Sequence, residues 1–157
     1  MFIQIIASMI GVIAFAVWFG TPWRLCVRCG ITGAISWTVY WILYNEGVSA
    51  AVATVIAAML LTVVGRIFSA VKLVPATIFL VSGIFPLVPG AGLYYTAYYI
   101  MADNIAMAGE KGIETFKIAL AIAIGLSIGA ALPQKLFNKL GEEVVKVRGR
   151  FGIVRKQ

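Results

Sequence analysis

Residues 73–102 read LVPATIFLVSGIFPLVPGAGLYYTAYYIMA, a run of 30 residues without Asp, Glu, Lys or Arg. A helix crosses a hydrocarbon core of about 30 Å with about 20 apolar residues, so this run is too long for one straight crossing and too short for two. Its interior contains Pro86 and Pro89, and each interior proline costs a helix about 3 kcal/mol. We expect one crossing that is broken near these prolines; a re-entrant hairpin is the alternative.

Four other uncharged runs flank this stretch, at 1–23, 29–45, 47–65 and 118–134. Each is close to the length of one membrane-spanning helix. Of the 157 residues, 62% are hydrophobic and 12% are charged, against a charged share of about 25% in soluble domains. The sequence therefore predicts an all-α integral membrane protein with about five transmembrane helices, the fourth broken at Pro86 and Pro89.

Five crossings separate the charged residues into two groups. Eleven of the thirteen Lys and Arg residues fall on one side, and the other side holds Glu46 and the segment 103–117, which we expect to be loops. Because Lys and Arg collect in cytoplasmic loops, we expect the N-terminus outside and the C-terminus in the cytoplasm. The net charge of +7 then reflects topology and not nucleic-acid binding. We divide the chain into a transmembrane bundle, 1–138, and a basic cytoplasmic tail, 139–157.

The break in 73–102 is the candidate site. Open backbone inside a membrane must be satisfied by protein, water or a ligand, and transporters place binding sites at such breaks. We expect one half-helix to end near Gly83 with free carbonyls and the next to begin near Gly90 with N–H groups that favour a carboxylate. A kink that serves only packing is the alternative. The expected substrate-binding residues are Thr77, Ser82, Gly83, Pro86, Pro89, Gly90, Tyr94 and Tyr95.

Asp103 borders the long uncharged run. We consider it as a proton-handling or exit-side carboxylate, with a plain helix-end charge as the alternative. Small residues recur every four positions and predict close helix packing. These stripes are Thr54, Ala58 and Thr62 in the third run and Ala121, Gly125 and Gly129 in the last.

Nothing in the sequence points to a reaction. The chain has no histidine, and the Cys26-x-x-Cys29 pair cannot supply the four ligands of a zinc site. It has no glycine-rich phosphate loop and no carboxylate pair placed for acid–base chemistry. We therefore expect no metal, no cofactor and no enzymatic activity.

The segments Pro75-Ala76-Thr77 and Gly83-Ile84-x-Pro86-Leu87-Val88-Pro89-Gly90, followed by Tyr94-Tyr95, resemble the threonine/serine exporter (ThrE-type) family. The chain is similar to its small, half-length members, which match the C-terminal membrane half of the full-length exporters. The resemblance implies export of small hydroxy amino acids or small carboxylates across the bacterial inner membrane, driven by the proton gradient. It also implies a larger membrane subunit as partner.

We interpret the chain as a subunit of a secondary transporter. A proton-coupled carrier usually needs a carboxylate within the membrane, and none of the five uncharged runs holds one. Either Asp103 or the partner therefore supplies it. Two other functions remain open: a structural or assembly subunit without a substrate path of its own, and a homo-oligomeric channel.

Overall fold

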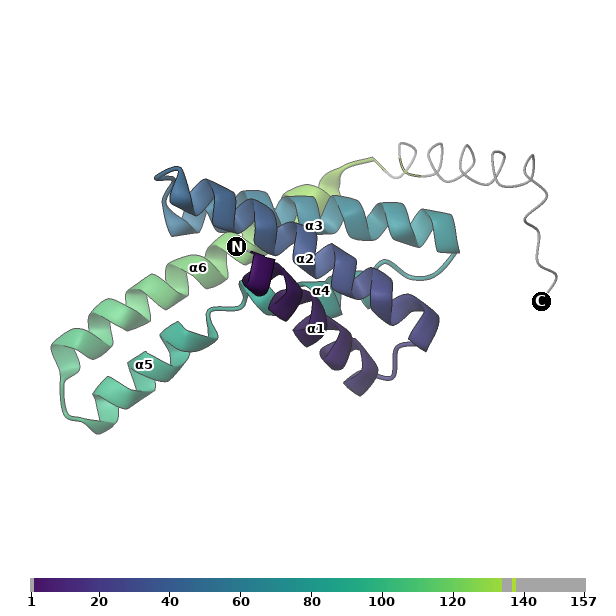
Figure 1. Cartoon of the computed structure of the whole chain (residues 1–157). Helices are drawn as coiled ribbons and strands as arrows, with labels where there is room; N and C mark the ends of the chain where they lie inside the picture. Colours follow the sequence, from purple (N-terminus) through teal and green to yellow (C-terminus); the bar gives the residue numbers. More distant parts are fainter. Residues whose placement is uncertain (1, 134–136, 138–157) are drawn as a thin grey trace, which may run out of the picture.

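The computed structural model describes residues 2–133 and 137, and the regular structure within them is helical (Figure 1). The predicted tail, 139–157, lies outside the described residues. In chain order the elements are α1 (Phe2–Trp18), α2 (Trp23–Asn45), α3 (Ala50–Lys72), α4 (Thr77–Gly83), the 3₁₀ turn η1 (Phe85–Leu87), α5 (Gly90–Met101) and α6 (Ile105–Ala131).

The lengths of these helices confirm the predicted membrane fold. Among the described residues, α2, α3 and α6 are long and apolar enough to cross a membrane. A fourth candidate span consists of Thr77–Leu87 and Gly90–Met101, which meet at a bend of 51°. The helix α1, with 17 residues, is apolar but shorter. With α1 counted, the arrangement agrees with about five crossings, the fourth broken at the predicted prolines.

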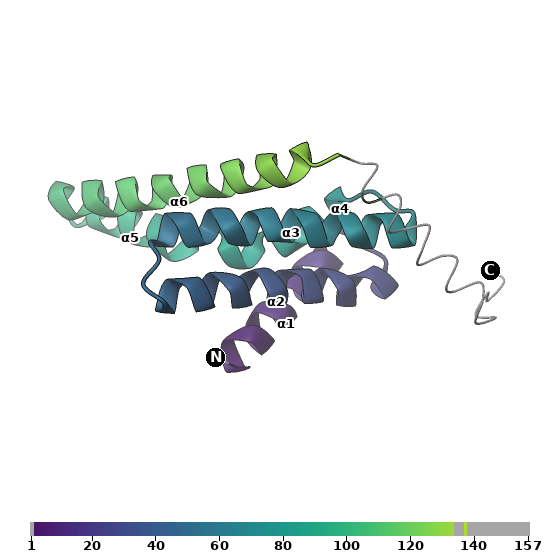
Figure 2. The same ribbon diagram turned by 90° about the horizontal axis from the view of Figure 1, so that it is seen from above.

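The helices α3 and α6 run parallel and pack through the two predicted stripes of small residues. A Cβ atom added to Gly129 would lie 2.5 Å from Cβ of Thr62, and one added to Gly125 would meet the Val55 carbonyl and the Ala58 side chain. Only glycine lets the two backbones approach this closely. Figure 2 shows α2, α3 and α6 side by side, with α2 antiparallel to α3.

Arg66, near the end of α3, fixes the end of α6. Its Nη1 atom donates to the carbonyl oxygens of Gly129, Ala130 and Leu132 at 3.0, 3.0 and 2.8 Å. The last carbonyls of a helix have no partner within it and carry a partial negative charge, so a guanidinium stabilises them. The same contacts place Arg66 at the end of the bundle from which the predicted basic tail follows.

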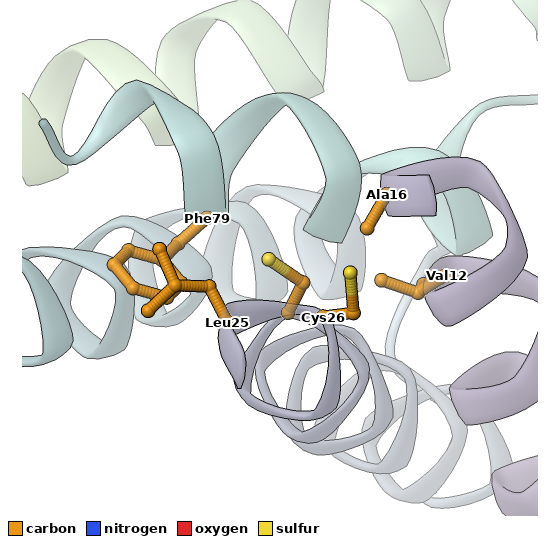
Figure 3. Packing of buried hydrophobic residues seen from close by; sticks show 6 residues of the cluster. Val12, Ala16, Leu25, Cys26 and Phe79 are labelled. Atoms are coloured by element: carbon orange, nitrogen blue, oxygen red, sulfur yellow. The ribbon is translucent and has the colours of Figure 1, made fainter. Parts of the chain in front are cut away.

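A cluster of buried apolar side chains joins α1, α2 and α4. Figure 3 shows its buried side chains, which include Val12, Ala16, Leu25, Cys26 and Phe79. Cys29 belongs to the same cluster, and its thiol donates to the Ile78 carbonyl of α4 at 3.6 Å. Both cysteines are free and buried. They therefore serve here as small apolar side chains in the contact where α4 packs against α2.

The segment 103–117, expected as a loop, differs from the prediction because it is helical from Ile105 onward. Helix α6 begins at Ile105, and the side chain of Asn104 accepts a hydrogen bond from the Met107 N–H at 3.2 Å as its N-cap. The four charged residues from Glu110 to Lys117 lie within this helix, and α5 packs against it. We call α5 and the first half of α6, residues 90–117, the hairpin; Figures 1 and 2 both show it projecting past the ends of α2 and α3.

Candidate functional site

The break between α4 and α5 has a defined backbone path. α4 ends at Gly83 and α5 begins at Gly90, as predicted. Between them, Val88 is extended, its N–H donates to the Phe85 carbonyl at 3.2 Å, and its carbonyl accepts from the Gly90 N–H at 2.8 Å. In a continuous helix the Phe85 carbonyl would lack a partner, because Pro89 has no N–H. Here the Val88 N–H supplies that hydrogen bond. The first N–H groups of α5 have no acceptor within their own helix.

The break lies at mid-depth in the bundle. Leu87, its last 3₁₀ residue, is buried in one cluster with Ala57 and Ala58 of α3 and Ile122 of α6. Ala57 is close to the centre of the uncharged run 47–65 of α3. A broken span at this depth is the arrangement that transporters use to place a binding site.

A cavity of about 600 Å³ opens beside the break. Its volume is within the range of roughly 300–1,000 Å³ that is typical of small-molecule sites. α2, α3, η1, α5 and α6 all contribute to its wall. The lining residues are Trp37, Tyr40, Thr54, Pro86, Leu87, Val88, Pro89, Gly90, Ala91, Gly92, Tyr95, Tyr99, Lys111, Glu114, Thr115 and Ile118.

One wall of the cavity carries an ion pair. The Lys111 Nζ atom lies 3.0 Å from Oε2 of Glu114, one turn further along α6. The Lys111 side chain is 33% exposed and that of Glu114 is 56% exposed. Both charges remain accessible from the cavity, so together they offer a cation and an anion to a bound molecule.

Two of the lining residues, Trp37 of α2 and Thr54 of α3, carry polar groups. Nε1 of Trp37 is buried and has no hydrogen-bond partner among the described residues. Such an unpaired donor is costly to bury unless something accepts its hydrogen. The hydroxyl of Thr54 donates to the Ala50 carbonyl at 2.7 Å, which leaves its oxygen free to accept.

Close contact between α5 and α6 shapes the wall formed by the hairpin. A Cβ atom on Gly92 would collide with Oγ1 of Thr115, which itself donates to the Lys111 carbonyl at 2.7 Å. Further along, a Cβ on Gly112 would lie 3.5 Å from Cγ2 of Thr96. Gly92 therefore sets how near α5 approaches the helix that carries Lys111 and Glu114.

The structure brings four of the eight predicted site residues together at the cavity. They are Pro86, Pro89, Gly90 and Tyr95. Tyr94, the neighbour of Tyr95, is 64% exposed and lies on the outer side of α5.

The remaining three predicted residues lie on α4, away from the cavity. Thr77 is exposed in its first turn. Ser82 is buried, and Gly83 packs against α2 and α3, where an added Cβ would lie 2.8 Å from Cδ1 of Leu61. Asp103 lies in the turn between α5 and α6 with φ = 58°, at the far end of the hairpin.

Sequence reasoning named as site residues only four of the sixteen residues that line the cavity. Lys111, Glu114 and Thr115 were assigned to a loop because the uncharged run begins only at residue 118. A signal was present, since Lys111 and Glu114 have opposite charges three residues apart and helical spacing pairs such residues. Trp37 and Tyr40 carried no such signal, because aromatic residues are common in any membrane helix. Among residues 2–133 and 137, no three His, Cys, Asp or Glu side chains gather to hold a metal ion.

An apolar helical bundle of this kind, with a span broken at mid-depth, is an integral membrane protein. A family model described as "Threonine/Serine exporter, ThrE" matches residues 4–132. The chain belongs to this threonine/serine exporter family, which confirms the resemblance seen in the sequence.

One curated relative is much longer than this chain. A protein named "Threonine/serine exporter" from Corynebacterium glutamicum is 30% identical over an alignment of 141 residues, and the match covers 88% of this chain. The match covers 27% of that relative, so the chain spans about a quarter of its length. No solved structure matches the chain.

Proposed function

We propose that the chain is one subunit of a secondary transporter that exports small amino acids of the threonine/serine type, or small carboxylates, across the bacterial inner membrane. The observation that carries this proposal is the cavity of about 600 Å³ beside a span broken at mid-depth. Membership of the threonine/serine exporter family supports transport out of the cell.

The cavity wall fits a small molecule with charged ends. Lys111 would attract the carboxylate, together with the first N–H groups of α5, which favour anions. Glu114, 3.0 Å from Lys111, would attract an ammonium group. The substrate-binding residues in this proposal are Pro86, Pro89, Gly90 and Tyr95, joined by Lys111 and Glu114. Tyr94, Thr77, Ser82 and Gly83 lie outside the cavity.

Export is driven by protons in this proposal, so a carboxylate must change its protonation during the cycle. Either Asp103 or a residue of the partner supplies this carboxylate. Asp103, in the turn at the end of the hairpin, is kept as an exit-side carboxylate.

The subunit acts with a larger membrane partner. Nearly three quarters of the Corynebacterium glutamicum relative lies outside the region that matches this chain. We place the N-terminus outside and the C-terminus in the cytoplasm, because Arg24, Arg66 and Lys72 all lie at one end of the bundle and basic residues collect on the cytoplasmic side.

An export assay with paired substitutions tests this function. Cells that lack the chain are loaded with labelled threonine, serine or succinate, and efflux is followed after the chain is restored with its partner. We expect Lys111→Gln and Glu114→Gln to lower efflux at least tenfold. Lys117→Gln and Glu110→Gln, matched changes on α6 outside the cavity, should leave it within twofold of the wild type.

Other outcomes assign the chain to another class. Normal efflux with both cavity variants would make the subunit structural, with the substrate path elsewhere. Transport by the purified chain alone in proteoliposomes would instead establish a homo-oligomeric channel.

A further inference from the structure

A second cavity lies at the other end of the contact between α3 and α6. Its volume is about 390 Å³, which is also within the range typical of small-molecule sites. Residues of α3, α4 and the end of α6 contribute to its wall, and its polar side chains are those of Thr62, Arg66 and Ser69. We call it the Arg66 cavity.

The contacts within the bundle use only part of the Arg66 guanidinium. Its hydrogen bonds to the described residues all come from Nη1, which donates to three carbonyls at the end of α6. The ring of Phe137 covers one face of the group, with its centroid 4.3 Å from Cζ. A guanidinium has five N–H donors in one plane, so the edge formed by Nε and Nη2 remains available. Such an edge binds a carboxylate through two parallel hydrogen bonds.

No acidic side chain of the described residues is near enough to neutralise Arg66. The described acidic residues all lie at the other end of α3 and α6: Glu46, Asp103, Glu110 and Glu114. Glu114 precedes Gly129 by 15 residues, which is about 22 Å along α6. The carbonyls at the end of a helix supply only about half a negative charge. Because Arg66 is also partly withdrawn from water, its charge favours a bound anion.

Two hydroxyl groups in the same cavity complement the guanidinium. Oγ1 of Thr62 donates to the Ala58 carbonyl at 3.0 Å, and Oγ of Ser69 donates to the Val74 carbonyl at 2.6 Å. Each hydroxyl has thereby used its one hydrogen, so its oxygen can only accept. The Arg66 cavity thus offers donors to a carboxylate and acceptors to an ammonium or hydroxyl group.

Close packing separates the Arg66 cavity from the cavity beside the break. The cavity beside the break reaches Thr54 of α3, and the Arg66 cavity reaches Thr62, about 12 Å further along the same helix. Between these levels Gly125 of α6 packs on Ala58, where an added Cβ would lie 2.7 Å from Cβ of Ala58. The two cavities are therefore distinct, with the contact between α3 and α6 lying between them.

We propose that the Arg66 cavity is a second binding site for the transported solute and holds its carboxylate on Nε and Nη2 of Arg66. This inference rests on the proposed function, from which it takes the solute, a small amino acid or small carboxylate, and the orientation of the chain. In that orientation Arg66 lies at the cytoplasmic end, where an exported solute is taken up. Lys111, in the cavity beside the break, would then bind the same carboxylate later in the cycle.

Chemical protection of Arg66 tests the inference without any transport. The full chain is purified from its membrane with any protein that stays bound, and it is treated with phenylglyoxal, which modifies arginine. Mass spectrometry measures the rate at each arginine. We expect threonine, serine or succinate, each added alone, to include at least one solute that slows modification of Arg66 at least fivefold. Arg24, an exposed arginine at the same end of the bundle, is the internal control and should react at an unchanged rate.

A cavity-filling variant gives a second measurement, because replacement of Arg66 itself would also loosen the end of α6. Calorimetry is done in a Lys111→Gln background, which removes the cation of the other cavity, and the protecting solute should still bind. Adding Ala130→Phe, which places a ring in the Arg66 cavity, should weaken this binding at least tenfold. Ala123→Phe is the matched control, on the same helix, also exposed and outside both cavities.

Several results would overturn the proposal. One is equal affinity of the two phenylalanine variants, and another is an Arg66 that phenylglyoxal does not modify in the absence of solute. Protection by inorganic phosphate or phosphatidylglycerol, but by none of the three solutes, would assign the cavity to a free phosphate or to a lipid head group. If Arg66 reacts only after Glu142→Gln and Glu143→Gln are introduced, the tail supplies its counter-ion.

The two proposals fail separately in these experiments. If a solute protects Arg66 but the intact transporter exports none of the three, the Arg66 cavity stands as a carboxylate site and the proposed function fails. If export depends on Lys111 and Glu114 but no solute protects Arg66, the function stands and Arg66 serves only to cap α6.

Discussion

Nη1 of Arg66 in α3 donates to the carbonyl oxygen of Gly129 in α6 at 3.0 Å, so one guanidinium joins the ends of two parallel helices. Hydrogen bonds that involve a charged group contribute about 1.5–3 kcal/mol. We expect Arg66→Met to lower the free energy of unfolding by about that amount. Thermal unfolding in detergent, followed by tryptophan fluorescence, measures the change, and Lys117→Met on the exposed side of α6 serves as the control.

The contact between α3 and α6 makes a second prediction. Gly125→Ala should lower the free energy of unfolding by about 1–3 kcal/mol, because the new Cβ atom meets the Val55 carbonyl and overpacks the contact. Gly109→Ala is the matched control on the same helix. It has nothing within 4 Å, so it should stabilise the protein by up to about 1 kcal/mol through helix propensity alone. Equal effects of the two substitutions on the free energy of unfolding would mean that α3 and α6 do not pack closely at Gly125.

Gly92→Ala tests the shape of the cavity wall. The added methyl collides with Oγ1 of Thr115, which forces α5 away from the helix that carries Lys111 and Glu114. In the export assay that tests the proposed function, we expect efflux to fall at least tenfold while the amount of protein in the membrane stays constant. Gly112→Ala, whose Cβ would make an ordinary contact with Thr96 at 3.5 Å, should transport normally.

The bend at the broken span can be tested by straightening it. Pro89→Ala restores an N–H that could bond the Phe85 carbonyl and continue the helix. Spin labels at Leu73 and Met101, both exposed, then report the distance across the break by electron–electron double resonance. Loss of the 51° bend should lengthen it by about 3 Å for helices that rise 1.5 Å per residue. An unchanged distance would show that packing around Leu87, and not Pro89, maintains the bend.

The two thiols give a test of the core. Cys26 and Cys29 are buried between α1, α2 and α4, so a maleimide should label neither in the folded protein and both after denaturation. Rapid labelling of the native protein would contradict the packing of α4 on α2. A Met101→Cys variant, exposed at the hairpin tip, provides the positive control.

Much of the fold could be predicted because membrane helices are marked by length and by the absence of charge. The break at Pro86 and Pro89 and the small-residue stripes of α3 and α6 follow from backbone chemistry that acts within one helix or between two. The start of α6 could not be found in this way. Four charged residues precede residue 118, and a helix that leaves the hydrocarbon can carry charges on its exposed turns.

The cavity was predictable only in part for a related reason. Pro86, Pro89 and Gly90 mark a break by their own conformational limits. Trp37 and Glu114, in contrast, reach the cavity because two other helices bring them there, and no local pattern records that approach. Ser82 and Gly83 show the converse, since their small size serves close packing of α4 as well as it could serve a binding site.

The continuity of α6 has a mechanical consequence. From Ile105 to Ala131 it is a single helix, clamped to α3 by Gly125 and Gly129 and at its end by Arg66. The 13 residues that precede this contact with α3, 105–117, pack on α5 and extend over about 20 Å. A tilt of about 5° about the clamped seam would move the tip by roughly 2 Å over that length. Such a tilt would move Lys111 and Glu114 relative to Trp37 and Thr54 and so would change the width of the cavity that these residues line.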